Sequence, residues 1–427
     1  MKMKRIEKLC SFINNSPTAY HAVASVKAEL LAAGYTEISP ADLASFCDGG
    51  KHFVTSGSSS IIAFDAKPSA GFMIAASHSD SPSFRVKLSG ESVGAYSRLM
   101  TEKYGGMIHY TWLDRPLSLA GRVVVRTPDG VEERLVNIDK NSLIIPSVAI
   151  HLNRGVNDGA KHNPATDLIP LMGMKGASSL ASALAGELSV SEADILSHDL
   201  FLYNRDEARV CGISDDLIVS PRLDDLECVH ASLLAFLESG ENGSATKILA
   251  VFDNEEVGSE TKQGAASAFL HDTLRKIAGS DEKYYAMLDS SFMVSADNAH
   301  GKHPNHPELS DAENAPLLGG GVVVKYNGNQ RYTTDGVSDA IFRVVAEKCG
   351  VTLQRYYNRA DLPGGSTLGS IATTKVPLSC IDIGLPQLAM HSANETAAIS
   401  DYLDMEKLLS AFYSSSIKRN FSKIEIK

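Results

Sequence analysis

The order of apolar and polar residues predicts helices and strands in alternation near the start of the chain. In SPTAYHAVASVKAELLAAGY, apolar residues recur at helical spacing, and Val23, Val26 and Leu30 share one face. Ser16 can cap this helix, and Gly34 can end it. The next segment, KHFVTSGSSSIIAF, predicts a hairpin. GFMIAASHSD then predicts a buried strand that ends in polar residues.

The middle of the chain, from about Gly90 to Ala208, has a different pattern. TWLDRPLSLAGRVVVRTPDGVEERLVNI predicts strands joined by a Pro-Asp-Gly turn, without the long helices of the flanking segments. HLNRGVNDGAKHNPATD is polar and rich in Gly and Asn, which predicts a surface loop. The segment is typical of an inserted, β-rich unit, and strand and helix alternation returns after it.

Length and composition narrow the class of protein. A chain of 427 residues exceeds what one hydrophobic core usually serves, so we expect two units. The net charge of -11 argues against a nucleic-acid partner, which needs a basic surface. Six scattered cysteines without C-x-x-C spacing favour reduced thiols and a cytoplasmic location. The start lacks the apolar region of a signal peptide, and we expect no membrane span.

Polar clusters follow apolar runs at several places in the chain, as S-H-S-D, R-L-D-D, D-N-E-E, S-A-D-N-A-H and A-M-H-S. In an α/β sheet, catalytic groups gather at strand ends. Histidine and carboxylate side chains without thiolates suit catalytic zinc, manganese or cobalt. Two cations about 3.5 Å apart need a shared carboxylate between them. The pattern therefore predicts a dinuclear hydrolase with these candidate ligands: His78, Asp224, Glu256, Asp297 and His391.

Three of these motifs have a structural alternative when taken alone. Asp80 can orient His78 through the second imidazole nitrogen, although a histidine near an aspartate is often a surface pair. Asp224 and Asp225 open a predicted helix, where an acidic residue is a routine N-cap. We expect Asp225 to cap or to face solvent. His391 alone could equally be a structural histidine.

The remaining acidic motifs are harder to explain without a cation. Three acidic side chains in four positions, in D-N-E-E, repel one another at a strand end unless a cation is bound. A metal site uses one glutamate as ligand and its neighbour as base, which assigns roles to Glu256 and Glu255. Asp297 precedes a loop with three histidines, and it alone lies close enough to the strand end to be predicted as a ligand.

These segments resemble the M18 family of metalloaminopeptidases, the aspartyl aminopeptidase group. The resemblance rests on SPTAYHAV, AASHSDSPSFRVK, TWLDRPLSLAGRV, IPSVAIHLNR, SPRLDDL, VFDNEEVGS, SADNAHGKHPNHPE, DLPGGSTLG and LPQLAMHSANET, which cover nearly the whole chain in family order. It implies an α/β fold with a mixed-sheet, dinuclear zinc aminopeptidase domain formed by residues 1–89 and 209–427. Residues 90–208 would be an inserted β-rich dimerisation or lid domain.

The resemblance also implies roles for the site residues. It implies two divalent cations per subunit, zinc by preference or else cobalt or manganese. One would be held by His78, Asp224 and Asp297, and the other by Asp224, Glu256 and His391. Glu255 matches the general base, which takes a proton from the attacking water and passes it to the leaving amine. Asp80 matches the residue that tunes His78.

Three further residues match substrate-binding positions of the family. His151 in HLNR matches a histidine that reaches into the partner subunit's active site. Lys325 matches a position linked to recognition of an acidic first side chain, although a lysine in a strand can also protect a sheet edge. His300 matches a position near the substrate. The family also forms dimers that assemble into a tetrahedral dodecamer.

The sequence thus predicts a metal-dependent aminopeptidase that removes N-terminal residues, with Asp or Glu preferred, from peptides. Small departures such as T-T-D-G-V-S put the side-chain preference in doubt, so a neutral or apolar preference is one alternative. A deacylase or carboxypeptidase on the same metal scaffold is another. A non-catalytic, peptide-binding assembly protein is the alternative outside the enzymes.

Overall fold

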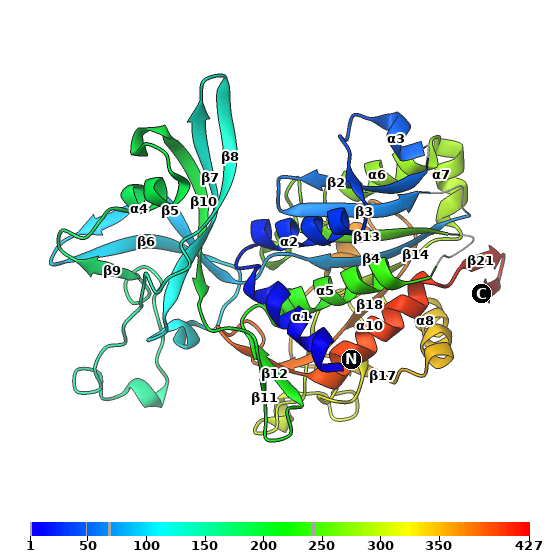
Figure 1. The fold of residues 1–427 in the computed structure, drawn as a ribbon. Coiled ribbons are helices and arrows are strands. Elements are labelled where there is room, and N and C mark those ends of the chain that lie inside the picture. Colours follow the sequence, from blue (N-terminus) through cyan, green and yellow to red (C-terminus); the bar gives the residue numbers. More distant parts are fainter. Residues whose placement is uncertain (1, 48, 67–69, 241–244) are drawn as a thin grey trace.

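The protein is described here by a computed structural model, which defines residues 2–47, 49–66, 70–240 and 245–427. A nine-stranded sheet with helices on both faces makes up the larger part, and a six-stranded sheet lies beside it (Figure 1). The chain enters the smaller part after β4 (Phe72–His78) and returns through β11 (Arg209–Cys211) and β12 (Leu217–Ser220).

The nine-stranded sheet has the order β1-β2-β3-β13-β4-β14-β18-β16-β17. Its centre is parallel and consists of β13 (Thr246–Phe252), β4, β14 (Phe292–Ala296) and β18 (Ser379–Gly384). The outer strands are β1 (Thr36–Glu37), β2 (Gly50–Ser56), β3 (Ser60–Ala66), β16 (Val322–Tyr326) and β17 (Leu353–Tyr357). Every residue of β4 and β13 is buried, as expected for strands covered on both faces. Because parallel strands end at the same edge, the polar residues after them meet there.

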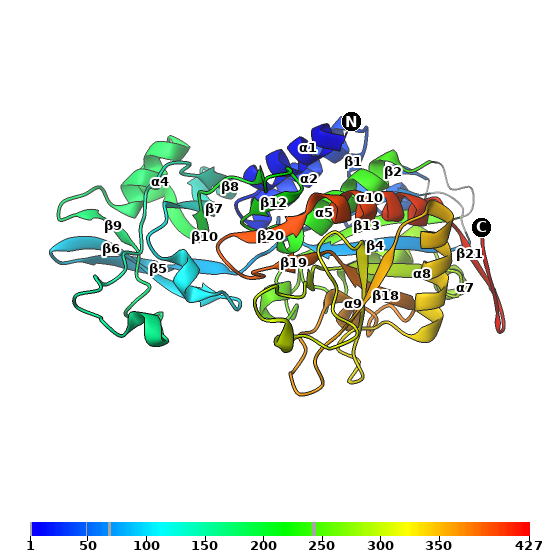
Figure 2. The same cartoon turned by 90° about the horizontal axis from the view of Figure 1, so that it is seen from below.

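Two layers of helices cover this sheet (Figure 2). One apolar core joins it to α1 (Lys2–Asn14), α2 (Ala19–Ala32), α5 (Leu223–Glu238), α8 (Gly336–Cys349) and α10 (Ile399–Tyr413). A second core joins it to α3 (Leu43–Cys47), α6 (Phe269–Ala278), α7 (Asp281–Leu288) and α9 (Leu368–Ala372). Within the described ranges, no helix has both the length and the apolar character needed to cross a bilayer.

The six-stranded sheet is antiparallel and has the order β8-β7-β10-β5-β6-β9. Its strands are β5 (Ser83–Val93), β6 (Tyr96–Tyr104), β7 (Leu117–Thr127), β8 (Gly130–Asn137), β9 (Leu171–Met174) and β10 (Ile195–Asn204). Together with α4 (Leu180–Leu188) and the 3-10 helices η1 (His109–Trp112), η2 (Val156–Asp158) and η3 (Glu192–Asp194), they form this part of the molecule. Its apolar side chains form a separate core. The sheet thus spans residues 83–204, while the division into domains at residues 90 and 208 remains a prediction.

A five-stranded sheet connects the end of the insertion to the larger part of the molecule. Its order is β11-β12-β20-β19-β15, with β20 (Glu395–Ala398), β19 (Pro386–Leu388) and β15 (Ala299–His300). The remaining short elements are η4 (Glu255–Val257), η5 (Pro307–Leu309) and the terminal hairpin of β21 (Ile417–Asn420) and β22 (Lys423–Ile426). The five-stranded sheet brings the segments that follow β12, β14 and β19 close together in space.

The predicted elements near the start of the chain are present, with one error at a helix end. The hairpin of β2 and β3 and the buried strand β4 are confirmed. In α2, Val23, Val26 and Leu30 are buried as predicted. The prediction that Ser16 caps this helix is wrong, because α2 begins at Ala19 with Thr18 at the N-cap position. Helix boundaries depend on local backbone geometry that a pattern of residue types specifies only loosely.

One buried histidine of the core makes stability depend on pH. His230 lies within α5, and its Nδ1 is 2.7 Å from the hydroxyl oxygen of Tyr402. Burial, together with the nearby charges of Lys8 and Arg5, lowers the pKa of His230 from 6.5 to about 3. Between these values the unfolded chain binds a proton here that the folded chain does not. Folding stability is therefore lost as the pH falls below the unfolded value.

We expect the wild type to lose about 1.4 kcal/mol more unfolding free energy than His230→Gln between about pH 7.5 and about pH 5.5. Urea denaturation of both proteins at the two pH values measures this difference. His306 has a largely exposed side chain, so His306→Gln is the matched control and should keep the wild-type pH dependence. Equal losses in the wild type and His230→Gln would contradict the assignment of this effect to His230.

Candidate functional site

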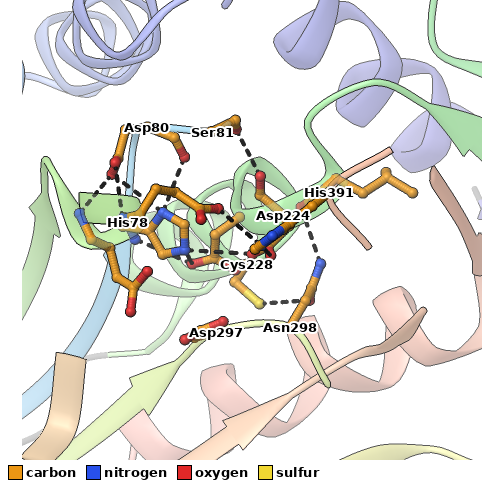
Figure 3. Close-up of polar contacts among 12 residues, drawn as sticks. His78, Asp80, Ser81, Asp224, Cys228, Asp297, Asn298 and His391 are labelled. Carbon is orange, nitrogen blue, oxygen red and sulfur yellow. Dashed lines mark hydrogen bonds and ion pairs between the residues drawn. The ribbon is translucent and has the colours of Figure 1, made fainter. Parts of the chain in front are cut away.

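The five predicted ligands lie close together beside the edge where the central parallel strands end. Figure 3 labels four of them: His78, Asp224, Asp297 and His391. They come from separate segments of the chain. His78 is the last residue of β4, Asp224 lies in the first turn of α5, and Glu256 lies in η4 after β13. Asp297 follows β14, and His391 follows β19. The parallel arrangement of β13, β4 and β14 is the reason that these segments converge.

Asp224 lies between the two histidines. Its Oδ1 is 3.4 Å from Nε2 of His78, and its Oδ2 is 3.3 Å from Nε2 of His391. The same nitrogen of His391 is 3.3 Å from Oε1 of Glu256. Asp224 and Asp225 both have non-helical backbone angles at the start of α5. The two oxygens of one carboxylate thus face two different imidazoles, as a bridging ligand requires.

Among the described residues, three groups of side chains place possible ligand atoms within 4.8 Å of one another. These groups are His78 with Asp224, Asp225 and Asp297; His78 with Glu255 and Glu256; and Asp224 with Glu256 and His391. The first and third contain the two ligand sets expected from the sequence. The structure therefore brings together every residue of both sets.

The donor atoms fit a small divalent cation. Oδ1 of Asp224 and Oε1 of Glu256 are buried without a hydrogen-bond partner, which is costly for a carboxylate that nothing neutralises. Two atoms bound at about 2.0–2.1 Å to a tetrahedral cation lie about 3.4 Å apart. The separations of 3.3 and 3.4 Å between the imidazole nitrogens and the carboxylate oxygens match that value. Zinc suits this set of nitrogen and oxygen donors.

The histidines and carboxylates of this cluster perturb one another strongly. Burial alone would lower the pKa of His78, but Asp225, Asp224 and Asp80 raise that pKa well above its usual value. Burial likewise opposes the charge on His391, whereas its contacts with Asp224 and Glu256 raise its pKa to about 12. Without a cation, protons on the imidazoles balance the carboxylates. A bound cation would replace those protons, so cation binding releases them.

Glu255 belongs to the group with His78 and Glu256. Burial raises the pKa of Glu255 well above its usual value, and the nearby carboxylate of Asp297 raises it further. The preceding Asn254 has a φ of +63° and occupies the N-cap position of η4. Glu255 therefore lies beside the candidate ligands, where a base for a water molecule is needed.

Asp80 contacts both His78 and η4. Nδ1 of His78 is 3.0 Å from the main-chain oxygen of Asp80 and 3.4 Å from its carboxylate, so the shorter contact is to the main chain. The carboxylate accepts hydrogen bonds from the N–H groups of Glu255 at 3.1 Å and Glu256 at 3.2 Å. Asp80 thus orients one imidazole and also holds the two glutamates.

Two carboxylates of the site were not recognised in the sequence. Asp225 is buried, and its Oδ2 accepts a hydrogen bond from the main-chain N–H of His78 at 3.1 Å. The expectation that Asp225 caps the helix or faces solvent is therefore wrong. Glu395 accepts from the N–H groups of His391 at 2.6 Å and Asp224 at 3.0 Å. A glutamate four residues after His391 was the available signal for it.

The ammonium group of Lys325 contacts Asp297 at one side of the cluster. Its ammonium donates to the main-chain oxygens of Asp297 at 2.6 Å and Asn298 at 3.2 Å, and it lies 3.6 Å from Oδ1 of Asp297. The alternative that Lys325 protects a sheet edge is wrong, because β16 lies between β18 and β17 and the side chain is buried. Lys325 therefore adds a buried positive charge next to a candidate ligand.

The two predicted substrate-binding histidines lie in different settings. His300 is solvent-accessible in β15, and its ring lies edge-on to Tyr356 with the ring centres 5.9 Å apart. His151 is exposed in the long segment between β8 and β9 and belongs to none of the three groups of possible ligands among the described residues. Their roles in substrate binding remain predictions.

Comparison with known proteins assigns the family. The family described as "Aminopeptidase I zinc metalloprotease (M18)" matches residues 12–413. A probable M18 family aminopeptidase 2 from Clostridium acetobutylicum is 42% identical over 424 residues, which cover 95% of this chain and 98% of the relative. A chain in the cryo-EM structure of the Ape4 and Nbr1 complex is 35% identical with a TM-score of 0.93, covering 97% of this chain and 86% of that one. The S. cerevisiae mApe1 dodecamer shares the fold, with 23% identity, a TM-score of 0.84 and 96% of each chain covered. The chain therefore belongs to the M18 family of zinc metallo-aminopeptidases.

Proposed function

We propose that this protein is a dinuclear aminopeptidase that removes N-terminal residues, Asp or Glu by preference, from peptides. The observation that carries the dinuclear assignment is the position of Asp224, whose two carboxylate oxygens face His78 and His391 separately. When bound, two divalent cations supply positive charge that lowers the pKa of a water molecule and stabilises negative charge on the carbonyl oxygen.

Each side chain of the cluster has its own role in this proposal. His78, Asp224 and Asp297 would hold one cation, and Asp224, Glu256 and His391 would hold the other. Glu255 lies beside both sets, where it can take the proton of the attacking water and deliver it to the leaving amine. Asp80 keeps Glu255 and Glu256 in place through their main-chain N–H groups.

The preference for an acidic first residue rests on the resemblance of Lys325 and His300 to substrate-binding positions. The buried charge of Lys325 supports it, because a cation near the site attracts a carboxylate. The hydrogen bonds of Lys325 to Asp297 and Asn298 favour the alternative, a neutral or apolar first residue, because its ammonium is already committed.

The proposal extends to the assembly and location of the protein. Residues 1–89 and 209–427 would form the catalytic domain, and residues 90–208 the dimerisation or lid domain. Dimers would assemble into a dodecamer, in which His151 reaches the partner's active site. The S. cerevisiae mApe1 dodecamer and the exposed apolar side chains of Val148, Ile150 and Leu152 beside His151 support this. The scattered, unpaired cysteines support a cytoplasmic location.

Metal analysis combined with a substrate panel tests the proposal. We expect about two zinc ions per chain, loss of hydrolysis on chelation, and recovery with zinc, cobalt or manganese. Aspartyl and glutamyl 4-nitroanilides should give a higher kcat/KM than leucyl and alanyl ones. One cation per chain at full activity would refute the dinuclear site. A higher kcat/KM for the leucyl substrate would establish the neutral or apolar preference instead.

A further inference from the structure

The strand β6 of the six-stranded sheet ends at the candidate cation site. Its last residue, Tyr104, donates a hydrogen bond from its hydroxyl group to Oδ2 of Asp80 at 2.7 Å. The same hydroxyl accepts from Nδ2 of Asn254 at 2.8 Å, and Oδ1 of Asn254 accepts from the hydroxyl of Thr261 at 2.8 Å. A chain of hydrogen bonds thus runs from Thr261 through Asn254 and Tyr104 to Asp80.

Tyr104 belongs to the six-stranded sheet, and its side chain donates a hydrogen bond to the Asp80 carboxylate. The N–H groups of Glu255 and Glu256 also donate to this carboxylate, and Nδ1 of His78 lies 3.4 Å from it. A phenol that donates to a carboxylate makes a charge-assisted hydrogen bond, which is stronger than a neutral one. It fixes the rotation of the carboxylate and, through it, the positions of η4 and the His78 ring.

The residues after Tyr104 contact the second candidate ligand set. Gly105 has a φ of +75°, and a Cβ atom there would lie 3.2 Å from Cβ of Glu256, so the backbone passes close to that ligand. The main-chain oxygen of Gly106 is 2.9 Å from Nδ1 of His391. The N–H group of Ile108 donates to the main-chain oxygen of His391 at 2.9 Å. This short segment therefore supports both the side chain and the backbone of His391.

We infer that Tyr104 is a positioning residue, and that residues 104–108 form a strap through which the six-stranded sheet sets the geometry of both candidate cation sites. The ring of Tyr104 lies edge-on to Phe201 of β10, with centres 5.4 Å apart, so the sheet itself holds the hydroxyl in place. Mutation of a residue that orients a metal ligand typically lowers metal affinity or activity about 10- to 100-fold. We expect an effect of the same size for Tyr104.

Solvent can reach this network when the hydroxyl is removed. A cavity of about 400 Å³ lies between the two parts of the molecule, and its lining includes Asp80, Tyr104, Asp224 and His391. Without the phenol, water from the cavity can compete for the Asp80 carboxylate, which then loses its fixed orientation. The inference rests on the ligand set of the proposed function, so its test must also measure cation binding in the wild type.

The test is Tyr104→Phe, studied as full-length protein by zinc transfer to a chromophoric chelator and by the visible absorption spectrum of the cobalt-substituted form. We expect zinc affinity about 10- to 100-fold weaker, a changed cobalt spectrum, and a lower kcat at nearly constant KM. Tyr96→Phe is the matched control, because Tyr96 is exposed on the same strand and should leave all of these values unchanged.

The outcomes separate this inference from the proposed function. If the wild type binds zinc and Tyr104→Phe keeps its affinity, cobalt spectrum and kcat, the strap does not position the site. If the wild type itself binds no zinc, the ligand set of the proposed function fails. Thr261→Val removes the donor at the far end of the chain and should change the cobalt spectrum in the same direction. If Tyr104→Phe does not fold, Thr261→Val decides the question. An unchanged cobalt spectrum in folded Thr261→Val would then overturn the inference.

Discussion

We expect Glu255→Gln to lower kcat by about 10²- to 10⁴-fold and to retain any bound cations. Glutamine has nearly the same shape as glutamate but cannot accept the proton of the attacking water. The candidate ligand atoms of His78, Asp224, Glu256, Asp297 and His391 are unchanged in this variant. Steady-state hydrolysis of an aspartyl anilide or dipeptide, measured together with the zinc content of the same sample, tests both parts of the expectation.

The matched control is Glu260→Gln, because Glu260 is exposed in the same loop and should retain wild-type turnover. Near-normal hydrolysis by Glu255→Gln would exclude Glu255 as the base. A loss of zinc in Glu255→Gln would instead show that this residue is a ligand, so the zinc content distinguishes the two roles.

Asp224→Asn has the second large effect. The amide offers one oxygen where the carboxylate offers two, and in the structure each of those two oxygens faces a different histidine. The variant also loses the negative charge that would offset the repulsion between the two proposed cations. We expect fewer than two cations per chain and a kcat/KM lower by at least about 10³-fold, since several interactions with the reacting groups are lost together. Metal analysis after dialysis and steady-state kinetics measure these effects.

Asp289→Asn is the corresponding control, because Asp289 is an exposed aspartate at the C-terminal end of α7. It should bind two cations and turn over substrate as the wild type does. Full cation content in Asp224→Asn would contradict a bridging role and would assign each cation to a separate set of ligands.

The clusters at strand ends could be predicted because their positions follow from local patterns. Strands β4, β13 and β14 are buried along their whole length, and candidate site residues lie at or near the end of each. His78 is the last residue of β4, Glu255 and Glu256 lie a short turn after β13, and Asp297 directly follows β14. Parallel pairing then places those residues at one edge of the sheet without further information. The family resemblance supplied what the pattern lacks, namely the assignment of an aminopeptidase, which the family match confirms.

The supporting residues could not be predicted in the same way, because their roles depend on contacts between distant segments. Tyr104 carries no local signature of its contact with Asp80, and the contact of Glu395 with Asp224 joins segments far apart in sequence. The spacing of Glu395 from His391 was the one local signal for that residue. Lys325 could be taken for an edge residue because the order β18-β16-β17 is not visible in the pattern of a single strand. Asp225 resembles an ordinary helix-opening residue until the position of His78 is known.

The position of the six-stranded sheet within the chain has a consequence for how the protein is made. His78 precedes this sheet, whereas the other four candidate ligands follow it, and His391 lies near the end of the chain. On the ribosome, the candidate set of His78, Asp224 and Asp297 can be complete only after Asp297 has emerged. The candidate set with His391 requires nearly the whole polypeptide. The contacts that form the site are therefore long-range ones, which close large loops and form late in folding. We expect zinc to enter an almost finished fold rather than to guide its early stages.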